Sequence, residues 1–174
     1  VINSVTITPA DPKTNSLLEA IVDATDVDGD VLAFTYQWFK NDAELVGETS
    51  STLDLSVSGN GDRGDVISVQ VTINDINVDS EIASAEATIG NSAPIVSDHA
   101  VTMDEDTSSA FTLTAADADG DAFTFALVAT ALNGAVTLNS VTGEVTYTPN
   151  TDFFGADSFT FKANDGTDDG NVAT

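Results

Sequence analysis

Apolar residues alternate with polar ones along most of the chain, which is the pattern of β-strands with one buried face. The clearest runs are 32–39 and 66–73 in the first half, and 122–128, 135–147 and 158–163 in the second. Thr and Val fill many of the remaining positions, as is typical of half-buried strands. No window carries a sustained helical stripe. The pattern therefore predicts an all-β protein.

Within the run 32–39, the side chains of Phe34, Tyr36 and Trp38 fall on one face of the expected strand. A Trp in such company is typical of a sandwich core. We therefore expect Trp38 to be buried rather than to form a platform for a sugar ring.

Turn residues separate the runs at intervals of about ten residues, and this spacing favours a Greek-key sandwich. Asn, Asp and Gly dominate these turns. The predicted strands of the first half are 4–8, 17–23, 32–39, two short ones near Leu45 and Leu53, 66–73 and 82–89. Those of the second half are 110–114, 122–128, a hairpin over 135–147, and 158–163.

Two landmarks recur at nearly the same offset, which indicates an internal repeat. The segment Asp-x-Asp-Gly-Asp begins at Asp26 and again at Asp117, 91 positions later, and Asn-Asp recurs from 74 to 164, 90 positions later. We therefore expect two immunoglobulin-like β-sandwiches in tandem, at 1–90 and 95–174, joined by a short linker at 91–94. The last strand is expected to be cut short at Thr174, and the isolated segment is expected to be a monomer.

The charge is strongly one-sided. The chain holds 4 Lys and Arg against 29 Asp and Glu, for a formal net charge of −25. Such a chain repels phosphate backbones and anionic lipids, so we exclude nucleic acid as a partner and expect no insertion into a membrane. Divalent cations are the partners that this charge favours. The absence of Cys removes both disulfides and thiolate chemistry.

The repeated turn is the strongest candidate site. Three carboxylates within five residues repel one another by about 1 kcal/mol or more per contact near a protein surface unless a cation lies among them. Solvated Asp-Gly turns are the alternative, since each Asp can accept a hydrogen bond from its own backbone. The spacing is not that of an EF-hand, because the twelfth positions hold Gln37 and Val128 instead of Glu.

On the sandwich plan, the Asp-x-Asp-Gly-Asp loop and the Asn-Asp loop lie at the same end of each domain. Together they would supply the six to eight oxygens that calcium prefers. The expected ligands are Asp26, Asp28, Asp30 and Asp75 in the first domain, and Asp117, Asp119, Asp121 and Asp165 in the second.

A further calcium ion could lie at the joint between the domains. Chain order places the loop 62–65 and the linker beside the second domain's acidic loop. The expected ligands of this shared ion are Asp62, Asp65, Asn91, Asp117 and Asp119. Calcium would then stiffen the joint.

The second half resembles the bacterial cadherin-like tandem repeats of large secreted adhesins. The resemblance rests on Met103-Asp104-Glu105-Asp106-Thr107, on the acidic loop at 116–121, on 143–150, on Asp152-Phe153-Phe154-Gly155-Ala156-Asp157-Ser158-Phe159, and on Asn164-Asp165-Gly166. The first half, with Tyr36-Gln37-Trp38 and 61–65, is similar to PKD-type and cadherin-like repeats.

In cadherins, an Asp-Arg-Glu motif, an Asn-Asp linker and an Asp-x-Asp loop share calcium between domains. Asp62-Arg63 and Asp117-x-Asp119 occupy the corresponding places here. The chain departs from that pattern because Gly64 separates Arg63 from Asp65, and because the linker 91–94 is poorer in acid.

The resemblance implies an extracellular, calcium-binding, non-catalytic segment that serves adhesion or holds other modules away from a bacterial cell. Its partners would be other cadherin-like domains or surface polysaccharide. A calcium-dependent carbohydrate-binding module and a passive spacer are the alternative hypotheses. With one His and no Cys, the chain lacks the usual nucleophile and base pairs, so we expect no enzyme activity. We interpret His99 as a surface residue and Arg63-Gly64-Asp65 as an ordinary loop.

Overall fold

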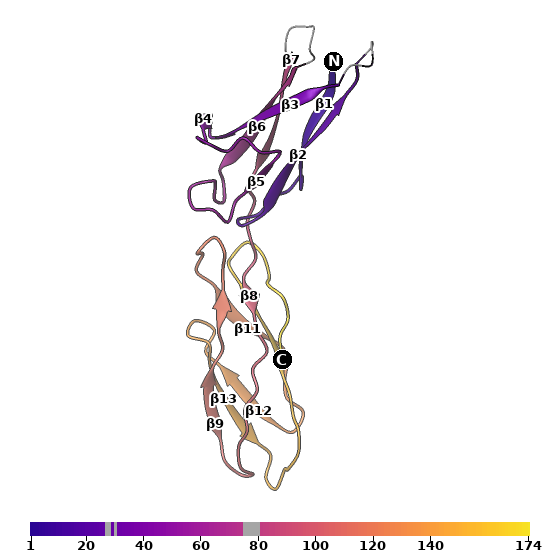
Figure 1. The fold of residues 1–174 in the computed structure, drawn as a ribbon. Coiled ribbons are helices and arrows are strands. Elements are labelled where there is room, and N and C mark those ends of the chain that lie inside the picture. Colours follow the sequence, from indigo (N-terminus) through magenta and orange to yellow (C-terminus); the bar gives the residue numbers. More distant parts are fainter. Residues whose placement is uncertain (27–28, 30, 75–80) are drawn as a thin grey trace. The chain divides into compact units, whose positions relative to one another are not determined.

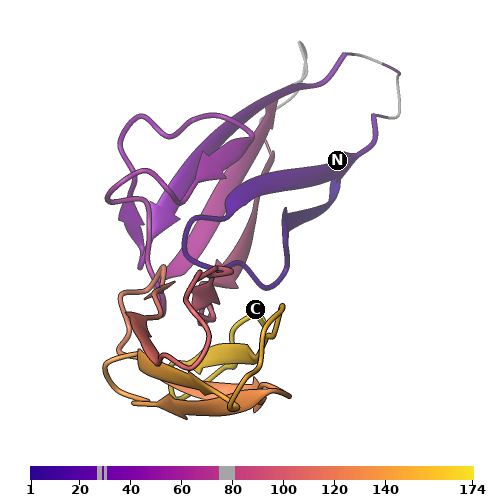
Figure 2. The ribbon, with the colours of Figure 1, turned by 90° about the horizontal axis from the view of Figure 1, so that it is seen from below.

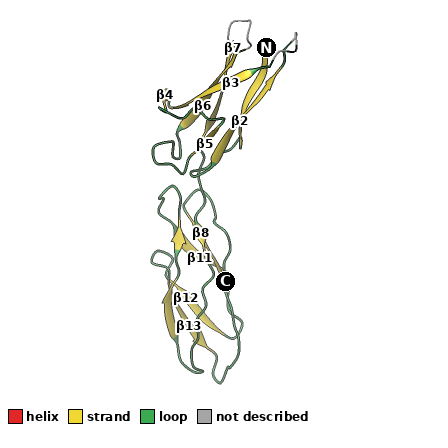
Figure 3. Cartoon of the chain, viewed as in Figure 1, coloured by secondary structure: helices red, strands yellow, loops and turns green. Residues whose placement is uncertain are grey.

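The computed structural model describes residues 1–26, 29, 31–74 and 81–174. It divides into two compact units, Val1–Asn91 and Ser92–Thr174. Strands and loops make up all of the described residues (Figure 3), and none of these residues forms a helix that could cross a membrane. The prediction of an all-β protein is confirmed.

The first unit consists of two antiparallel sheets (Figure 1). One sheet has the order β1-β2-β5 and the other the order β4-β3-β6-β7. The strands are β1 (Ile2–Thr8), β2 (Leu17–Ala24), β3 (Ala33–Lys40), β4 (Ala43–Glu44), β5 (Thr52–Asp54), β6 (Val66–Asn74) and β7 (Glu81–Thr88). Figure 2 gives a second view of the same strands.

Strand β6 shows why the alternating pattern was so clear there. It pairs with β3 from Lys40↔Ile67 to Ala33↔Asn74 and with β7 on its other side. Its buried residues are Ile67, Val69, Val71 and Ile73. A strand with neighbours on both edges and one buried face must alternate in this way, because successive side chains point to opposite faces.

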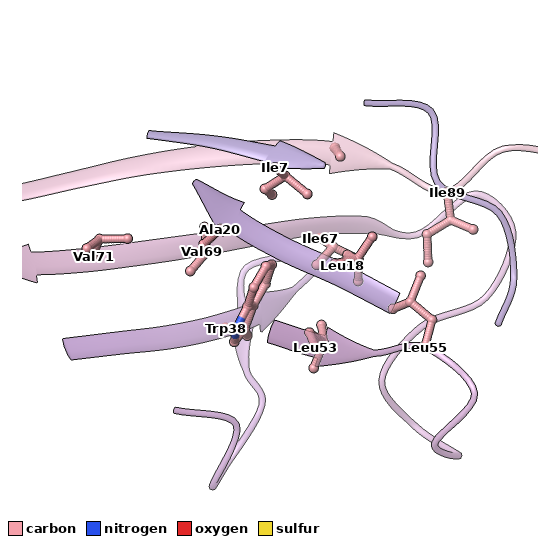
Figure 4. Packing of buried hydrophobic residues seen from close by; sticks show 11 residues of the cluster. Ile7, Leu18, Ala20, Trp38, Leu53, Leu55, Ile67, Val69, Val71 and Ile89 are labelled. Atoms are coloured by element: carbon pink, nitrogen blue, oxygen red, sulfur yellow. The ribbon is translucent and has the colours of Figure 1, made fainter. Parts of the chain in front are cut away.

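Trp38 lies in the centre of the first unit's core and is 0% exposed, so the prediction that it packs inside is confirmed. Leu18, Leu53 and Val69 belong to the same cluster (Figure 4). The indole Nε1–H donates a hydrogen bond to the carbonyl oxygen of Ser50 at 2.9 Å. Trp38 therefore combines a large apolar contact area with a satisfied polar group.

The second unit is built from shorter ladders. Its strands are β8 (Ile95–Val96), β9 (Ser109–Thr112), β10 (Ala115–Ala116), β11 (Thr124–Ala129), β12 (Gly134–Leu138), β13 (Glu144–Pro149) and β14 (Thr160–Asn164). They form the antiparallel groups β12-β13-β9, β11-β14 and β10-β8. The core cluster consists of Val96, Leu113, Phe125, Val145, Phe161, Ala163 and Ala173.

The strand expected at 110–114 is divided in the structure. Residues of β9 pair with β13, whereas β10 pairs with β8. Leu113 lies between them, is 3% exposed, and donates its N–H to the carbonyl of Gly143 at 2.9 Å. The chain therefore leaves one ladder and joins another at this residue.

The residues after β14 return along that strand. Ala173 and Phe161 exchange two backbone hydrogen bonds of 2.9 Å each. Gly170 lies so close to the start of the unit that a Cβ there would be 2.0 Å from the carbonyl oxygen of Pro94. Only glycine fits at this contact, which packs the last residues of the chain against the segment where the unit begins.

Candidate metal centre

The loop between β10 and β11 gathers three carboxylates in one place. Asp117, Asp119 and Asp121 each have one carboxylate oxygen that lies within 4.8 Å of the corresponding oxygens of the other two. All three residues are half-buried. In the described part of the chain, this is the group of acidic residues whose geometry would suit a metal ion.

The backbone of this loop explains the gathering. Asp117 Oδ1 accepts hydrogen bonds from the N–H of Asp119 at 2.9 Å and of Asp121 at 3.2 Å. Gly120 has a φ of 76°, a left-handed value that glycine adopts without strain. The loop is thus folded back around the Asp117 side chain, and this fold brings the other two carboxylates beside it.

The second oxygen of Asp117 is the least expected feature of the loop. Oδ2 is buried and has no hydrogen-bond partner among the described residues. A charged oxygen in that position loses water without receiving a donor in return, which costs free energy. Because two more carboxylates lie beside it, a bound cation is the simplest compensation.

Asp119 fixes the loop to the start of the unit. Its Oδ2 accepts a hydrogen bond from the N–H of Ser92 at 2.7 Å, and its Oδ1 accepts one from the Ser92 hydroxyl at 3.1 Å. A carboxylate has about four lone-pair sites, so a carboxylate that accepts hydrogen bonds can also bind a metal ion. The conformation of Ser92 therefore depends on the acidic loop.

The first copy of the turn is only partly within the described residues. Asp26 is half-buried, and Gly29 has a φ of 81°, close to the value at Gly120. The predicted ligands Asp28, Asp30 and Asp75 lie outside the described residues. Metal binding at this copy stays a prediction.

Asp165 follows β14 and is engaged in its own loop. Its Oδ1 accepts hydrogen bonds from the N–H groups of Thr167 and Asp168, each at 2.7 Å. It is not a member of the group formed by Asp117, Asp119 and Asp121. Its role as a fourth ligand stays a prediction.

Asp62 and Asp65 form a compact loop of their own in the first unit. The carboxylate of Asp65 accepts hydrogen bonds from the Asp62 N–H at 3.0 Å and from the Asn41 amide at 2.7 Å. The Asp62 N–H, aided by Asn41, holds the pKa of Asp65 below its ordinary value against the opposing effect of burial. Asn91 is half-buried at the end of this unit. The shared calcium ion stays a prediction; its expected ligands are these three residues together with Asp117 and Asp119.

Asp157 is a residue whose importance the sequence did not reveal. Its carboxylate accepts hydrogen bonds from the N–H groups of Leu132, Asn133 and Ser158 at 3.1, 2.8 and 3.0 Å, and from the Tyr147 hydroxyl at 2.9 Å. The sequence signal for Asp157 was its place in the segment 152–159. That segment does not indicate which residues donate hydrogen bonds to its carboxylate.

These hydrogen bonds change the titration of both partners. Burial raises the pKa of Asp157, but its four hydrogen bonds together outweigh burial, so the pKa is below its ordinary value. Burial and the Asp157 carboxylate raise the pKa of Tyr147. Asp157 therefore joins its own loop to the loop at Leu132 and Asn133 and to strand β13 at Tyr147.

The antiparallel ladders and the single buried cluster define the second unit as a small β-sandwich domain. Its sequence identifies the class more closely. Residues 91–174 match the family model described as the bacterial Ig domain.

A comparison with solved structures gives matches of low identity that cover nearly the whole chain. The extracellular domain of protocadherin GammaB4 is 16% identical, with a TM-score of 0.38 over 98% of this chain and 34% of that chain. The endo-fucoidan hydrolase MfFcnA4 is 18% identical, with a TM-score of 0.36 over 99% of this chain and 27% of that chain.

A third structure is SGBP-B of the Bacteroides ovatus mixed-linkage glucan utilization locus, in complex with a heptasaccharide. It is 12% identical, with a TM-score of 0.30 over 99% of this chain and 44% of that chain. The chain thus spans about a third of the protocadherin chain. No curated protein matches the chain. These TM-scores are low, and the description of the fold rests on the strands and their pairing.

Proposed function

We propose that this chain is a calcium-binding, non-catalytic tandem-repeat segment of a bacterial extracellular protein, in which calcium stabilises the acidic loop of the second unit. The proposal rests on one observation above all, the buried and unpartnered Asp117 Oδ2 beside the carboxylates of Asp119 and Asp121. The match of residues 91–174 to the bacterial Ig model supports the extracellular and non-catalytic parts.

Calcium suits this group of oxygens better than a softer metal. It prefers hard oxygen ligands at about 2.3–2.6 Å, so two ligands of one ion lie at most about 5 Å apart. The three carboxylates, within 4.8 Å of one another, satisfy that limit. Water and backbone carbonyls would complete the coordination.

The physiological effect would be to fix the segment by which the chain enters the second unit. Asp119 both belongs to the acidic group and holds Ser92 by two hydrogen bonds. An ion that orders Asp119 therefore also restricts Ser92, at the start of the unit. In a secreted or surface protein with several such repeats, calcium would limit the freedom of each repeat and so support adhesion at a distance from the cell.

Calorimetric titration of the metal-stripped chain tests this proposal. Calcium should produce heat with a Kd of about 10⁻⁴ to 10⁻³ M, the usual range for extracellular modules. The double variant Asp117→Asn and Asp119→Asn should lose the heat that belongs to the second unit. The control is Asp152→Asn, the same chemical change at an exposed residue whose φ of 57° also suits Asn. Absence of binding to the unaltered chain would reduce the segment to a passive spacer.

Calcium-dependent carbohydrate binding is the second hypothesis, and one observation favours it. Phe154 is 83% exposed in a part of the second unit that is rich in aromatic residues. A pull-down on insoluble polysaccharide, with calcium and then with a chelator, tests this hypothesis. Retention of the chain with calcium and its release by the chelator would support it.

A further inference from the structure

The second unit contains a long segment without charge. Residues 122–143 hold no Asp, Glu, Lys, Arg or His, although the whole chain has 29 acidic and 4 basic residues. This is the longest such segment of the sequence, and it includes all of β11 and β12. Because the formal net charge is −25, two copies of the chain repel each other over most of their surface. The uncharged segment is where two copies can approach with the least repulsion.

Within this segment, β12 is an edge strand. It pairs with β13 on one side, and no strand of the described residues pairs with its other side. Two hydrogen bonds at the ends of the ladder show which groups face β13. The Asn139 N–H donates to the Glu144 carbonyl, and the Asn150 N–H donates to the Asn133 carbonyl, each at 2.8 Å. Since bonded positions alternate along an antiparallel ladder, the odd-numbered residues of β12 bond to β13.

The even-numbered residues of β12 therefore direct their backbone groups outward. The N–H and C=O groups of Gly134, Val136 and Leu138 bond to no residue in the described part of the chain. Edge strands of natural proteins usually carry a charge, a Pro or a bulge that prevents further pairing. β12 has none of these, and its register with β13 is regular. The edge is thus open to another strand.

The side chains of β12 also suit the addition of a strand. Val136 and Leu138 pack against the core of the unit but are only half-buried. Ala135 and Thr137, on the other face, are exposed, small and uncharged. A strand added beside β12 would cover more of Val136 and Leu138 without burying a charge, which is favourable.

We propose that two copies of this chain associate through β12, which pairs with β12 of the second copy as an antiparallel strand. A two-fold axis beside Val136 brings this residue opposite Val136 of the second copy, and Gly134 opposite Leu138 of the second copy. The outward backbone groups then form about six hydrogen bonds, and the two sheets become one continuous sheet.

The ends of the strand support the same register. Leu132 and Val141 flank β12 and are 88% and 74% exposed. Continued past the ends of the strand, the pairing brings Leu132 of one copy next to Val141 of the other, twice in the dimer. Two exposed apolar side chains of each copy would thus be covered together.

Strand β9, at the opposite edge of the sheet, is less suited to this pairing. It lies between Asp104-Glu105-Asp106 and Asp117. Antiparallel pairing of β9 with its own copy would bring the acidic residues before the strand close to Asp117 of the second copy. Like charges at that distance repel, so charge favours the β12 edge.

The association is expected to be weak, because one short strand per copy gives an interface below the standard size. The monomer expected from the sequence would then be the state of the dilute chain. Salt screens the repulsion between two acidic copies, so association should strengthen as ionic strength rises. The edge lies outside the acidic loop, so this proposal stands or falls separately from the calcium proposal.

Sedimentation equilibrium of the whole 174-residue chain, in the presence of a chelator, measures the association. In about 0.5 M NaCl, the mean mass should rise toward twice the monomer value between about 10 µM and about 1 mM chain, and it should rise less in about 0.02 M NaCl. Where about nine-tenths of the chain is paired, amide hydrogen exchange should slow about tenfold at Gly134, Val136 and Leu138. Exchange at Ala110 and Thr112 of β9 should not change.

A matched pair of double variants locates the interface. Ala135→Glu with Thr137→Glu places Glu opposite Glu of the second copy and should abolish the rise in mass. Both positions are exposed, so the second unit should keep its fold, which its melting temperature checks. The control is Ala110→Glu with Thr112→Glu, the same changes at the same spacing on exposed positions of β9, and it should leave the association intact.

Three results would overturn the proposal. One is a monomer at about 1 mM in high salt with unchanged exchange along β12, which would leave this edge to a strand of different sequence. Another is association that persists in the folded β12 double variant. The third is association that only the β9 double variant abolishes, since that would move the interface to the opposite edge.

Discussion

The substitution Asp117→Asn separates the two opposing roles of this side chain. An amide oxygen can still accept the N–H groups of Asp119 and Asp121, which Oδ1 accepts at 2.9 and 3.2 Å. One negative charge disappears from a group that lies within 4.8 Å, so two of the three repulsive pairs vanish. Each pair at 4.8 Å costs about 1 kcal/mol in water and about 3.5 kcal/mol at the effective dielectric of a protein surface. Without calcium, the variant should therefore be at least as stable as the parent chain.

With calcium, the order should reverse. A site with a Kd of about 10⁻⁴ to 10⁻³ M stabilises the folded unit by about 1.4 to 2.7 kcal/mol at about 10 mM calcium. Loss of one charged ligand that weakens binding about tenfold would remove about 1 kcal/mol of this, because the stabilisation follows the logarithm of concentration over Kd. For a unit of this size, about 1 kcal/mol corresponds to a change of about 4 to 8 °C in Tm.

Scanning calorimetry with and without calcium measures these changes. A natural fluorescent probe distinguishes the unfolding of the two units. The chain's single Trp, Trp38, is buried in the first unit, so a melting curve followed by Trp fluorescence reports that unit alone. The calcium-dependent shift of the other transition should shrink in Asp117→Asn and remain in the control Asp152→Asn. The reasoning is refuted if Asp117→Asn keeps the full shift, or if the calcium-free variant melts well below the calcium-free parent.

Three further predictions concern the rest of the fold. Asp157→Ala removes the acceptor of four hydrogen bonds and should lower the free energy of unfolding by about 2 to 4 kcal/mol, measured by urea titration; a loss below about 0.5 kcal/mol would contradict this role of Asp157. The pKa of Asp157 is depressed in the folded state, so the ionised carboxylate stabilises the fold fully above about pH 4. This stabilisation is lost as the pH falls through the folded pKa. The stability difference between the parent chain and Asp157→Asn should therefore narrow below about pH 4, and a difference that widens on acidification would be inconsistent with this sign. Gly170→Ala places a Cβ where the Pro94 carbonyl oxygen lies, so it should destabilise the second unit by at least about 1 to 3 kcal/mol and leave the Trp38 melting curve unchanged.

The strands that could be predicted are those long enough for buried and exposed side chains to alternate several times. β6 is the best example, since four alternate residues are buried along nine. By contrast, β8 and β10 have two residues each, too few to show a period. Their pairing joins Ile95 to Ala116, and only the folded chain determines that contact. The division of the strand at Leu113 depends in the same way on partners far along the sequence.

The candidate site divides along similar lines. The spacing of Asp117, Asp119 and Asp121 was sufficient to predict that their carboxylates gather, because five consecutive residues with a glycine have few ways to turn. The bond from Ser92 to Asp119 and the burial of Asp117 Oδ2 could not be predicted, since both depend on packing. Asp157 was missed for the same reason, because Leu132 and Asn133 are 25 and 24 residues away from it.

Leu113 has a consequence for how the second unit comes apart. Because β9 and β10 are consecutive in the chain but belong to different ladders, neither ladder can separate without pulling on the buried Leu113 side chain between them. Ladders as short as β8 with β10 would fray on their own. Because the two ladders are joined through the buried Leu113, the separation of one ladder destabilises the other. The whole unit should therefore unfold in a single cooperative step.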